Sequence, residues 1–326
     1  MKTNIPERIA ALREAMRQQK VDAYIIPSSD PHLSEYPADR WKSREWISGF
    51  TGSAGTIVAG LWTDSRYFLQ AASQLEGSGI ELYKLALPET PSITEFLLHE
   101  LHAGQAVGLD GQTYSAAEAS ALANKLSRKE IKLDTSADLI EGIWKDRPAV
   151  PGNPIFEMPE ALSGASVHEK LDLINNQLRS EGADCLILAA LDEIAWTFNI
   201  RGTDVTYNPV VVSYAFVSED ESVLFIKPEK LTAEITEHLK KEGVTLAEYS
   251  MIQRYLSRLP ENSRVFVDMN KTNVSLYDAI PGNCTIVEGI SPANHLKSIK
   301  NETEIKGFQN AVVKDGVALT KFYIWL

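Results

Sequence analysis

The feature that most constrains the fold is a helix–strand unit that occurs twice in the chain. Residues 8–16 carry apolar side chains three and four positions apart, which predicts a helix, and the apolar run 21–26 predicts a strand that ends at Pro27. About 160 residues later the same order returns, with a predicted helix over 170–178 and a predicted strand over 182–188. The repeat is far longer than the roughly 20–50 residues of a solenoid unit, so it predicts two similar domains.

A proline-rich stretch separates the two copies. Residues 147–154 hold three prolines and one glycine. Proline fixes φ and removes a backbone donor, so this stretch cannot lie inside a helix or a central strand, and we expect a linker here. The predicted organisation is one domain over 1–150, a second over 158–300, and a single amphipathic helix over 302–326 that Asn301 can cap.

Further predicted elements alternate along both halves. The expected strands are 56–59, 210–212, 224–226 and 265–268, and the expected helices are 115–126, 231–241 and 252–259. Alternation at this spacing predicts α/β domains, each with a mixed sheet flanked by helices.

The composition is that of a soluble globular chain. Its 326 residues are 44% hydrophobic and 23% charged, so each half can bury its own core. The formal net charge of −12 argues against nucleic acid as a main partner. No apolar run reaches the roughly 18 residues that a membrane span needs. We expect a cytoplasmic protein in which Cys185 and Cys284 are buried free thiols.

No metal or nucleophile motif is recognisable. The chain contains no H-E-x-x-H, no P-loop and no G-x-S-x-G sequence. His99 and His102 could share a helix face, but a solvated helix end is the simpler interpretation. Ser53 lies in a glycine-containing turn, yet no histidine can be assigned as its base. We therefore expect no specific manganese or zinc site in residues 1–326.

Two stretches are chemically unusual, and the first spans residues 46–71. Three glycines within seven residues allow tight backbone turns next to a strand. Downstream, Asp64 and Arg66 flank a turn beside Tyr67. One interpretation is a β-turn with a surface ion pair. The other is an arginine held over an opening, where it can bind a carboxylate or a peptide carbonyl.

The second unusual stretch spans residues 191–209. Acidic residues stand at the start of a predicted helix, where the helix dipole favours them, and we expect this helix to end near Gly202. Four charged residues could form one polar network over the second sheet: Asp192, Glu193, Arg201 and Asp204. We interpret such a network as structural rather than functional.

Several segments, taken in order, resemble one known family. They read DAYIIPSSDPHLSEY from Asp22, SGFTGSAGT from Ser48, WTDSRYFLQAA from Trp62, IWKDRP from Ile143, LDEIAWTFNIRG from Leu191 and NPVVVSYAFV from Asn208. These segments resemble the first two domains of three-domain Xaa-Pro aminopeptidases, above all the long cytosolic type, in the creatinase/prolidase superfamily. The tail from Lys300 resembles the segment that leads into the catalytic domain of that family.

The resemblance implies two creatinase N-terminal-like domains of the ribonuclease-H-like fold. In this family a pita-bread catalytic domain follows and holds two divalent metals, usually manganese. Its ligands would all lie beyond Leu326, so the resemblance implies no cofactor, no metal ligand and no catalytic residue within this chain. The arginine of the family's WTD-x-RYF motif contributes to peptide binding and matches Arg66, whereas Ser65 replaces the glycine of the family pattern.

The implied function is that of a non-catalytic N-terminal part of an Xaa-Pro aminopeptidase, which removes an N-terminal residue that precedes proline. The two domains would restrict access to the active site, aid peptide binding and contribute to a homodimer, and this truncated chain would be inactive alone. The alternative is a stand-alone peptide-binding module without hydrolase activity. A complete enzyme with an unrelated site has little support, because no catalytic constellation is present.

Overall fold

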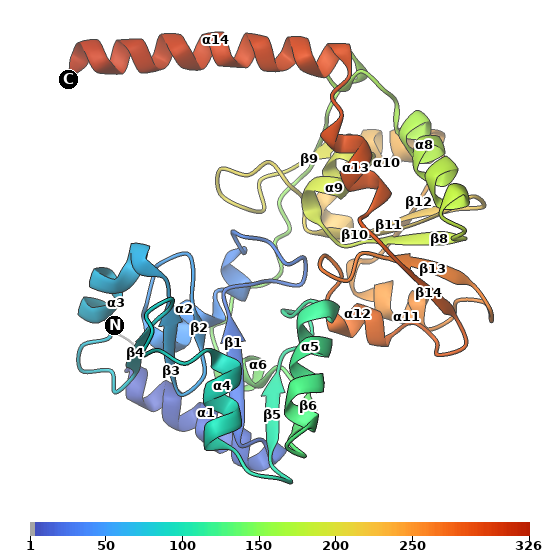
Figure 1. Cartoon of the computed structure of the whole chain (residues 1–326). Coiled ribbons are helices and arrows are strands. Elements are labelled where there is room, and N and C mark those ends of the chain that lie inside the picture. Colours follow the sequence, from blue (N-terminus) through green and yellow to red (C-terminus); the bar gives the residue numbers. More distant parts are fainter. Residues whose placement is uncertain (1–3) are drawn as a thin grey trace. The chain divides into compact units, whose positions relative to one another are not determined.

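A computed structural model describes residues 4–326, which fold into two compact units (Figure 1). Unit 1 comprises the chain up to Pro151 together with 253–259 and 269–281, and unit 2 comprises 152–252, 260–268 and 282–326. Each unit contains a six-stranded sheet of its own. Among residues 4–326, no helix combines the length and the apolar character needed to cross a membrane.

The sheet of unit 1 has the strand order β4-β3-β2-β1-β5-β6. Its strands are β1 Ala23–Pro27, β2 Thr56–Ile57, β3 Gly60–Thr63, β4 Glu81–Lys84, β5 Ala106–Leu109 and β6 Lys132–Asp134. Its helices are α1 Ile5–Gln19, α2 Ser43–Ser48, α3 Phe68–Gln74, α4 Ile93–Glu100, α5 Ala116–Ser127, α6 Leu139–Ile143 and α12 Val274–Asp278, with 3-10 turns η1 Asp39–Trp41 and η2 Ser65–Tyr67. β1 pairs antiparallel with β2 and parallel with β5, so the sheet is mixed.

Helices cover both faces of this sheet. Successive side chains of a strand point to opposite faces. Tyr24 and Ile26 accordingly belong to one apolar cluster, with Leu12 of α1, and Ile25 belongs to another, with Leu126 of α5. A strand buried on both faces explains why residues 21–26 form a continuous apolar run instead of an alternating one.

The sheet of unit 2 has the order β12-β11-β10-β8-β13-β14, and β7 and β9 form a separate pair. The strands are β7 Phe156–Glu157, β8 Cys185–Leu188, β9 Ile200–Arg201, β10 Ser213–Ser218, β11 Ser222–Ile226, β12 Val244–Ala247, β13 Arg264–Val267 and β14 Thr285–Glu288. The helices are α7 Glu160–Ser163, α8 Val167–Ser180, α9 Leu191–Thr197, α10 Ala233–Lys241, α13 Pro292–Ser298 and α14 Glu302–Trp325, with 3-10 turns η3 Pro228–Lys230 and η4 Tyr249–Met251. The helix α11 Ile252–Leu256 begins at the boundary, and its residues from Gln253 on belong to unit 1.

The two sheets confirm the predicted duplication and the predicted α/β class. β1 follows α1, and β8 follows α8 in the same way. Each of these strands is flanked by an antiparallel strand on one side, β2 or β10, and by a parallel strand on the other, β5 or β13. Strand orders that match position by position identify the units as two copies of one topology.

The strand predicted at 210–212 is wrong, because the strand of this region is β10. The backbone N–H of Val212 donates to the Asp204 carboxylate at 2.7 Å, and that of Val210 donates to the Asn208 carbonyl at 2.8 Å. These groups are therefore occupied outside a sheet ladder. The three valines are buried, and Val211 is fully covered. The apolar pattern of this segment therefore reflects burial and not a strand.

The helix predicted to end near Gly202 ends earlier, since α9 stops at Thr197. Asn199 then takes a left-handed conformation with φ of 50°, which turns the chain into β9. β9 pairs with β7, which lies just after the linker. The residues between Phe198 and Gly202 thus form a strand that pairs with a distant segment. The periodicity of residues 191–202 alone does not reveal such a pairing.

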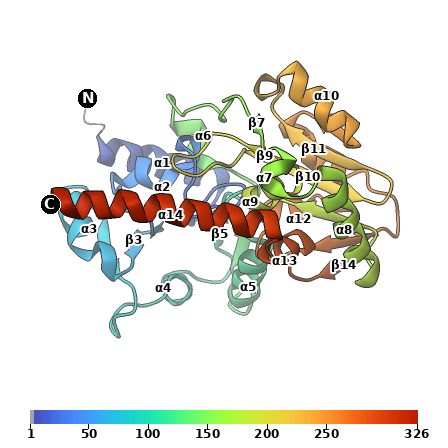
Figure 2. The same cartoon turned by 90° about the horizontal axis from the view of Figure 1, so that it is seen from above.

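The predicted helix over 302–326 is α14, which continues unbroken to the end of the chain in both views (Figures 1 and 2). Asn301 caps it, with the N–H of Glu304 bound to the Asn301 side chain and the Asn301 N–H bound to the Glu304 carboxylate. The Asn301 amide also donates to the carbonyl of Ser163 at 2.8 Å, which fastens the start of the helix to unit 2. Phe308, Val312, Phe322 and Trp325 of this helix are exposed.

Candidate functional site

An open groove with a volume near 670 Å³ lies at one edge of the sheet of unit 1. β1, β3 and β5 run in the same direction, so their carboxyl ends meet at this edge. Ser28 follows β1, Arg66 follows β3 and Ser115 follows β5, and all three line the groove. The chain continues from β1 to β2 on one side, while β5 lies on the other. Such a switch point is where open α/β sheets commonly bind ligands.

The groove is lined mainly by polar side chains. Its serines and threonines are Ser28, Ser29, Ser34, Ser53, Thr56, Thr113 and Ser115, and its charged residues are Glu35, Arg66, Glu118 and Lys271. The hydroxyl of Ser115 donates to the Glu118 carboxylate at 2.9 Å at the start of α5. With few apolar side chains, the groove suits polar main-chain atoms better than apolar side chains.

The Arg66 guanidinium is held in place by Asp64. Nε and Nη2 of Arg66 donate to the two carboxylate oxygens of Asp64, each at 2.8 Å, and the Arg66 backbone N–H donates to the same carboxylate at 3.1 Å. The hydrogen bonds from Arg66 lower the pKa of Asp64, and those bonds in turn raise the pKa of Arg66. The Arg66 side chain is nevertheless 63% exposed, so it remains accessible from the groove.

Tyr67 supports the same guanidinium from its ring face. Cζ of Arg66 lies 5.2 Å from the centre of the Tyr67 ring, within the range of a cation–π contact. The Tyr67 hydroxyl hydrogen-bonds to the hydroxyl of Ser53 at 2.7 Å, which lowers the pKa of Tyr67. The ring also meets Phe50 edge-on at 5.8 Å. These contacts fix the tyrosine ring and leave the arginine little freedom to turn.

The glycine-containing loop is clamped by Arg44, a buried residue that the sequence did not single out. Its guanidinium donates to the carbonyls of Phe50 and Gly52 and to the hydroxyl of Ser28. Burial lowers the pKa of Arg44 to about 10, so it stays charged at neutral pH. No local motif marks such a residue, because its partners are backbone carbonyls that the fold brings to it.

The glycines of this loop have the role that their spacing predicted. Gly49 takes a φ of 74° as the residue that caps the C-terminal end of α2. A Cβ on Gly52 would lie 2.2 Å from the Phe50 ring and 2.7 Å from the Tyr67 ring. Only glycine therefore lets Phe50 and Tyr67 approach the backbone this closely.

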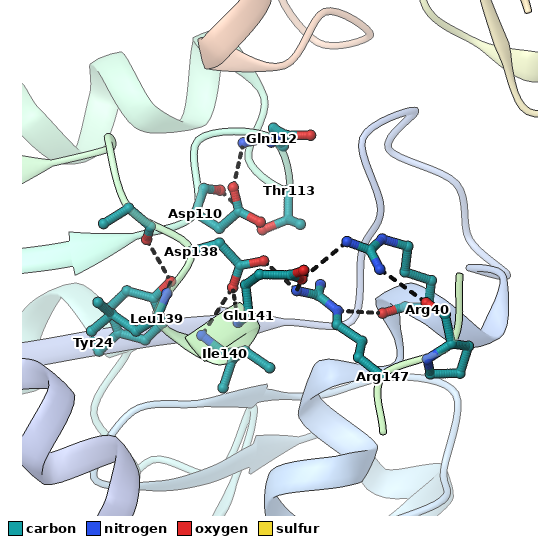
Figure 3. Close-up of polar contacts among 12 residues, drawn as sticks. Tyr24, Arg40, Asp110, Gln112, Thr113, Asp138, Leu139, Ile140, Glu141 and Arg147 are labelled. Carbon is teal, nitrogen blue, oxygen red and sulfur yellow. Dashed lines mark hydrogen bonds and ion pairs between the residues drawn. The ribbon is translucent and has the colours of Figure 1, made fainter. Parts of the chain in front are cut away.

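A second polar cluster in unit 1 fastens the start of the linker (Figure 3). Arg147 is nearly buried and donates to the carboxylates of Asp138 and Glu141 and to the carbonyl of Arg40. Arg40 in turn donates to Glu141 at 3.0 Å and to the Pro148 carbonyl at 2.9 Å. Arg147 and Pro148, the last two residues of the segment IWKDRP, therefore hold the start of the linker in place.

The four charged residues of the stretch 191–209 do not form the single network that was predicted. Asp192 pairs with Lys297 at 2.6 Å, and Arg201 donates to backbone carbonyls, including that of Ala195. Asp204 pairs with Lys230, and both side chains are fully buried. The reason is that α9 ends at Thr197, which places the acids and Arg201 on different elements.

Burial raises the pKa of Glu193, the remaining member of this set, to about 7, and the nearby Asp192 and Asp268 add to the increase. The side chain is 2% exposed on α9. The other three residues, Asp192, Arg201 and Asp204, have partners within unit 2.

The histidines and cysteines do not converge. His99 is exposed on α4 and pairs with Glu100 at 2.9 Å, and His102 lies past the end of that helix. Cys185 is buried, but Cys284 is only half-buried, and both are free. Within residues 4–326, no group of three or more His, Cys, Asp or Glu side chains is arranged to hold a metal ion.

Comparison with known proteins places these two units in context. Models of the creatinase/prolidase N-terminal domain match twice, at residues 8–143 and 146–304. The curated protein called probable Xaa-Pro aminopeptidase P from Penicillium rubens is 37% identical over 98% of this chain. A protein of the same name from Botryotinia fuckeliana is 38% identical over 99% of it.

A solved structure agrees with these matches. The crystal structure of X-prolyl aminopeptidase from Caenorhabditis elegans superimposes with a TM-score of 0.92 over 99% of this chain, at 28% identity. That protein is described as a cytosolic enzyme with a di-nuclear active site. This chain spans about half the length of these relatives, covering 54% and 52% of the two fungal proteins and 56% of the nematode protein.

Proposed function

Because this chain belongs to the creatinase/prolidase N-terminal domain family, in the tandem arrangement of Xaa-Pro aminopeptidases, we propose that it serves an enzyme of that activity. The reaction would remove an N-terminal residue that precedes proline. In this proposal the two units restrict access to the active site and help to bind the peptide. The proposed domains are 1–150 and 158–300, and residues 302–326 are proposed to be the helix that leads into a catalytic domain.

The observation that carries the proposal is the position of Arg66. It lies at the switch point of the unit 1 sheet, oriented by Asp64 and Tyr67, with its Nη1 group directed to no partner among the described residues. Arginine offers several N–H donors in a fixed plane, and a pre-oriented side chain loses less entropy when it binds. A peptide main chain in the groove would therefore meet ready hydrogen-bond donors.

Two divalent metals, with manganese as the proposed ion, would activate water at the active site of such an enzyme. The described residues of this chain do not fit a dinuclear site, since no suitable ligand group is present among residues 4–326. The chain's proposed contribution is therefore binding and exclusion rather than chemistry. We expect it to lack Xaa-Pro hydrolysis by itself.

The remaining elements of the proposal concern partners and location. Xaa-Pro peptides are the proposed ligands, a catalytic domain and a second copy of the chain are the proposed protein partners, and the cytoplasm is the proposed compartment. The cytosolic description of the nematode relative supports the last point. Arg66 would act either on its own subunit's substrate or on that of the partner.

A second function has one observation in its favour. Every residue of this chain that lines the groove belongs to unit 1, which includes Asn270 and Lys271 from the later part of the chain. A stand-alone peptide-binding module would need no more than this. Peptide binding by the chain alone, in the absence of any hydrolysis, would agree with both functions, and only a catalytic readout separates them.

The test of the proposal is Arg66→Ala in an enzyme that contains this chain with a catalytic domain. We expect kcat/KM for Xaa-Pro peptides to fall by about tenfold to a hundredfold, because charge-assisted contacts to the substrate are lost. Melting temperature and metal content should not change, since the side chain is 63% exposed.

Arg17→Ala provides a matched control. Arg17 is also an exposed arginine paired with a carboxylate, that of Glu14, but it lies on α1 outside the groove. Its removal should leave kcat/KM unchanged. Equal activity of the Arg66 and Arg17 variants, across short and long peptides, would reject a binding role for Arg66.

A further inference from the structure

The groove of unit 1 poses a question of specificity, because an arginine can bind either a terminal carboxylate or a main-chain carbonyl. We propose that Arg66 binds a neutral peptide carbonyl, and that Asp64 and Glu35 make the groove select against a free C-terminal carboxylate. The inference rests on the proposed peptide-binding function and deepens it. It names the ligand as an interior segment of a peptide rather than its carboxyl end.

The geometry shows which donors of Arg66 are left for a ligand. Asp64 fills the side-on fork, since it accepts from both Nε and Nη2. That fork is one of the two edges on which a carboxylate can form two parallel hydrogen bonds to an arginine. The remaining donors are the N–H groups of Nη1 and the outer N–H of Nη2, which form the other edge. They can converge on a single carbonyl oxygen or bind both oxygens of a carboxylate, so the geometry alone leaves both ligands open.

The charges decide between the two kinds of oxygen. Asp64 neutralises the guanidinium, and Glu35 adds a further negative charge to the same groove, so one cation faces two anions. The acids that shift the pKa of Arg66 are Asp64 and, more weakly, Glu35, and both raise it. A carboxylate would enter a locally negative site and be repelled, whereas a neutral carbonyl would keep the hydrogen bonds without that repulsion.

The opposite wall of the groove does not reverse this balance. Lys271 and the start of α5 are the features there that would attract an anion. The first turn of α5, however, already carries the Glu118 carboxylate, which accepts from the Ser115 hydroxyl. A ligand carboxylate on that side would therefore also lie near an acid, although the lysine would partly offset the repulsion.

The experiment compares paired peptides that differ only at the carboxyl end. Ala-Pro peptides extended with alanine to between three and six residues, each as free acid and as amide, are titrated into the isotope-labelled chain. Dissociation constants come from the amide resonances of Ser53 and Arg66. We expect the amide to bind about twofold to fivefold tighter than the acid at every length, and Arg66→Ala to weaken both by about tenfold.

Charge-removing variants test the cause. Asp64→Asn keeps a side-chain oxygen near Arg66 but removes its charge, and it should shift the acid-to-amide preference toward the acid by about threefold to tenfold. Glu35→Gln should shift it in the same direction by a smaller factor, without touching the Arg66 geometry. Asp39→Asn is the control, because Asp39 is an exposed acid paired with Lys42 outside the groove.

The possible results separate this inference from the proposed function. A parent chain that binds the acid as tightly as the amide, or more tightly, overturns the inference alone. So do Asp64 and Glu35 variants that keep the parental preference, provided that their melting curves match the parent. Absence of binding by either peptide, or binding that ignores Arg66→Ala, overturns the proposed function and the inference together.

Discussion

The two units share a strand order but differ in the segments that follow their central strands, β1 and β8. In unit 1 the carboxyl ends of β1, β3 and β5 surround an open groove that contains Arg66. In unit 2 the equivalent strand β8 is followed after two residues by α9, and α13 packs against α9 and α8. Where unit 1 leaves a groove open after its central strand, unit 2 thus has a helix almost directly after the equivalent strand.

Charged residues follow the same contrast. The Asp64–Arg66 pair of unit 1 is exposed and has donors to spare, whereas the Asp204–Lys230 pair of unit 2 is fully buried. A buried charge is tolerated only when an opposite charge is bound to it. The Asp204–Lys230 pair is therefore needed for stability and is not free to bind a ligand. A shared topology therefore does not by itself locate a binding site. The site depends on whether the loops after the strands leave the edge accessible.

The largest expected effect tests the buried pair of unit 2. Lys230→Met should lower the free energy of unfolding by about 3–5 kcal/mol, because it leaves the Asp204 carboxylate buried without its cation. One oxygen of Asp204 already lacks a hydrogen-bond partner, so little can replace the lysine. Urea denaturation followed by tryptophan fluorescence provides the measurement.

Two variants sharpen this test. Lys230→Met combined with Asp204→Leu removes both charges and should regain most of the lost stability. Lys42→Met removes the cation of the exposed pair with Asp39 in unit 1, and it should cost less than about 1 kcal/mol. If the Lys230 and Lys42 variants were equally stable, the buried pair would contribute no more to stability than the exposed pair, and the contrast between the two units would be wrong.

The next effect concerns the open edge of unit 1. Gly52→Ala should destabilise the chain by about 1–3 kcal/mol, because the added Cβ overlaps the rings of Phe50 and Tyr67. The displaced Tyr67 should also weaken peptide binding through its contact with Arg66. Gly142→Ala is the control, since a Cβ there meets no atom within 4 Å. Similar melting temperatures and peptide affinities for both variants would show that the loop tolerates the side chain.

The sequence predicted the fold of both units well, for a physical reason. The runs 21–26 and 182–188 are apolar because β1 and β8 are buried, and amphipathic helices precede both. Local patterns of this kind can be read from one segment. An apolar pattern indicates burial but not always a strand. Val211 is buried beside a sheet without belonging to a strand.

The candidate site was only partly predictable. The turn that carries Asp64 and Arg66 is local, so its chemistry could be recognised, and the family resemblance singled out the arginine. The groove itself could not be predicted, since Ser28 and Thr113 meet only through the parallel pairing of β1 with β5. Arg44 was missed because its partners are backbone carbonyls, which leave no mark in the residue pattern.

The smallest expected effect uses pH to probe α9, the helix that follows β8 in unit 2. Burial raises the pKa of Glu193 from its ordinary 4.5 to about 7, so the folded chain favours the protonated carboxyl. This contribution to stability is complete below about pH 4.5 and is lost as the pH rises through about 7. Glu193→Gln keeps the residue neutral at every pH. The variant should therefore be more stable than the parent by about 1–2 kcal/mol at pH 8.5 and equal to it at pH 4.5. Urea denaturation at both pH values measures the difference. A stability difference that is the same at both pH values would mean that folding does not raise the pKa of Glu193.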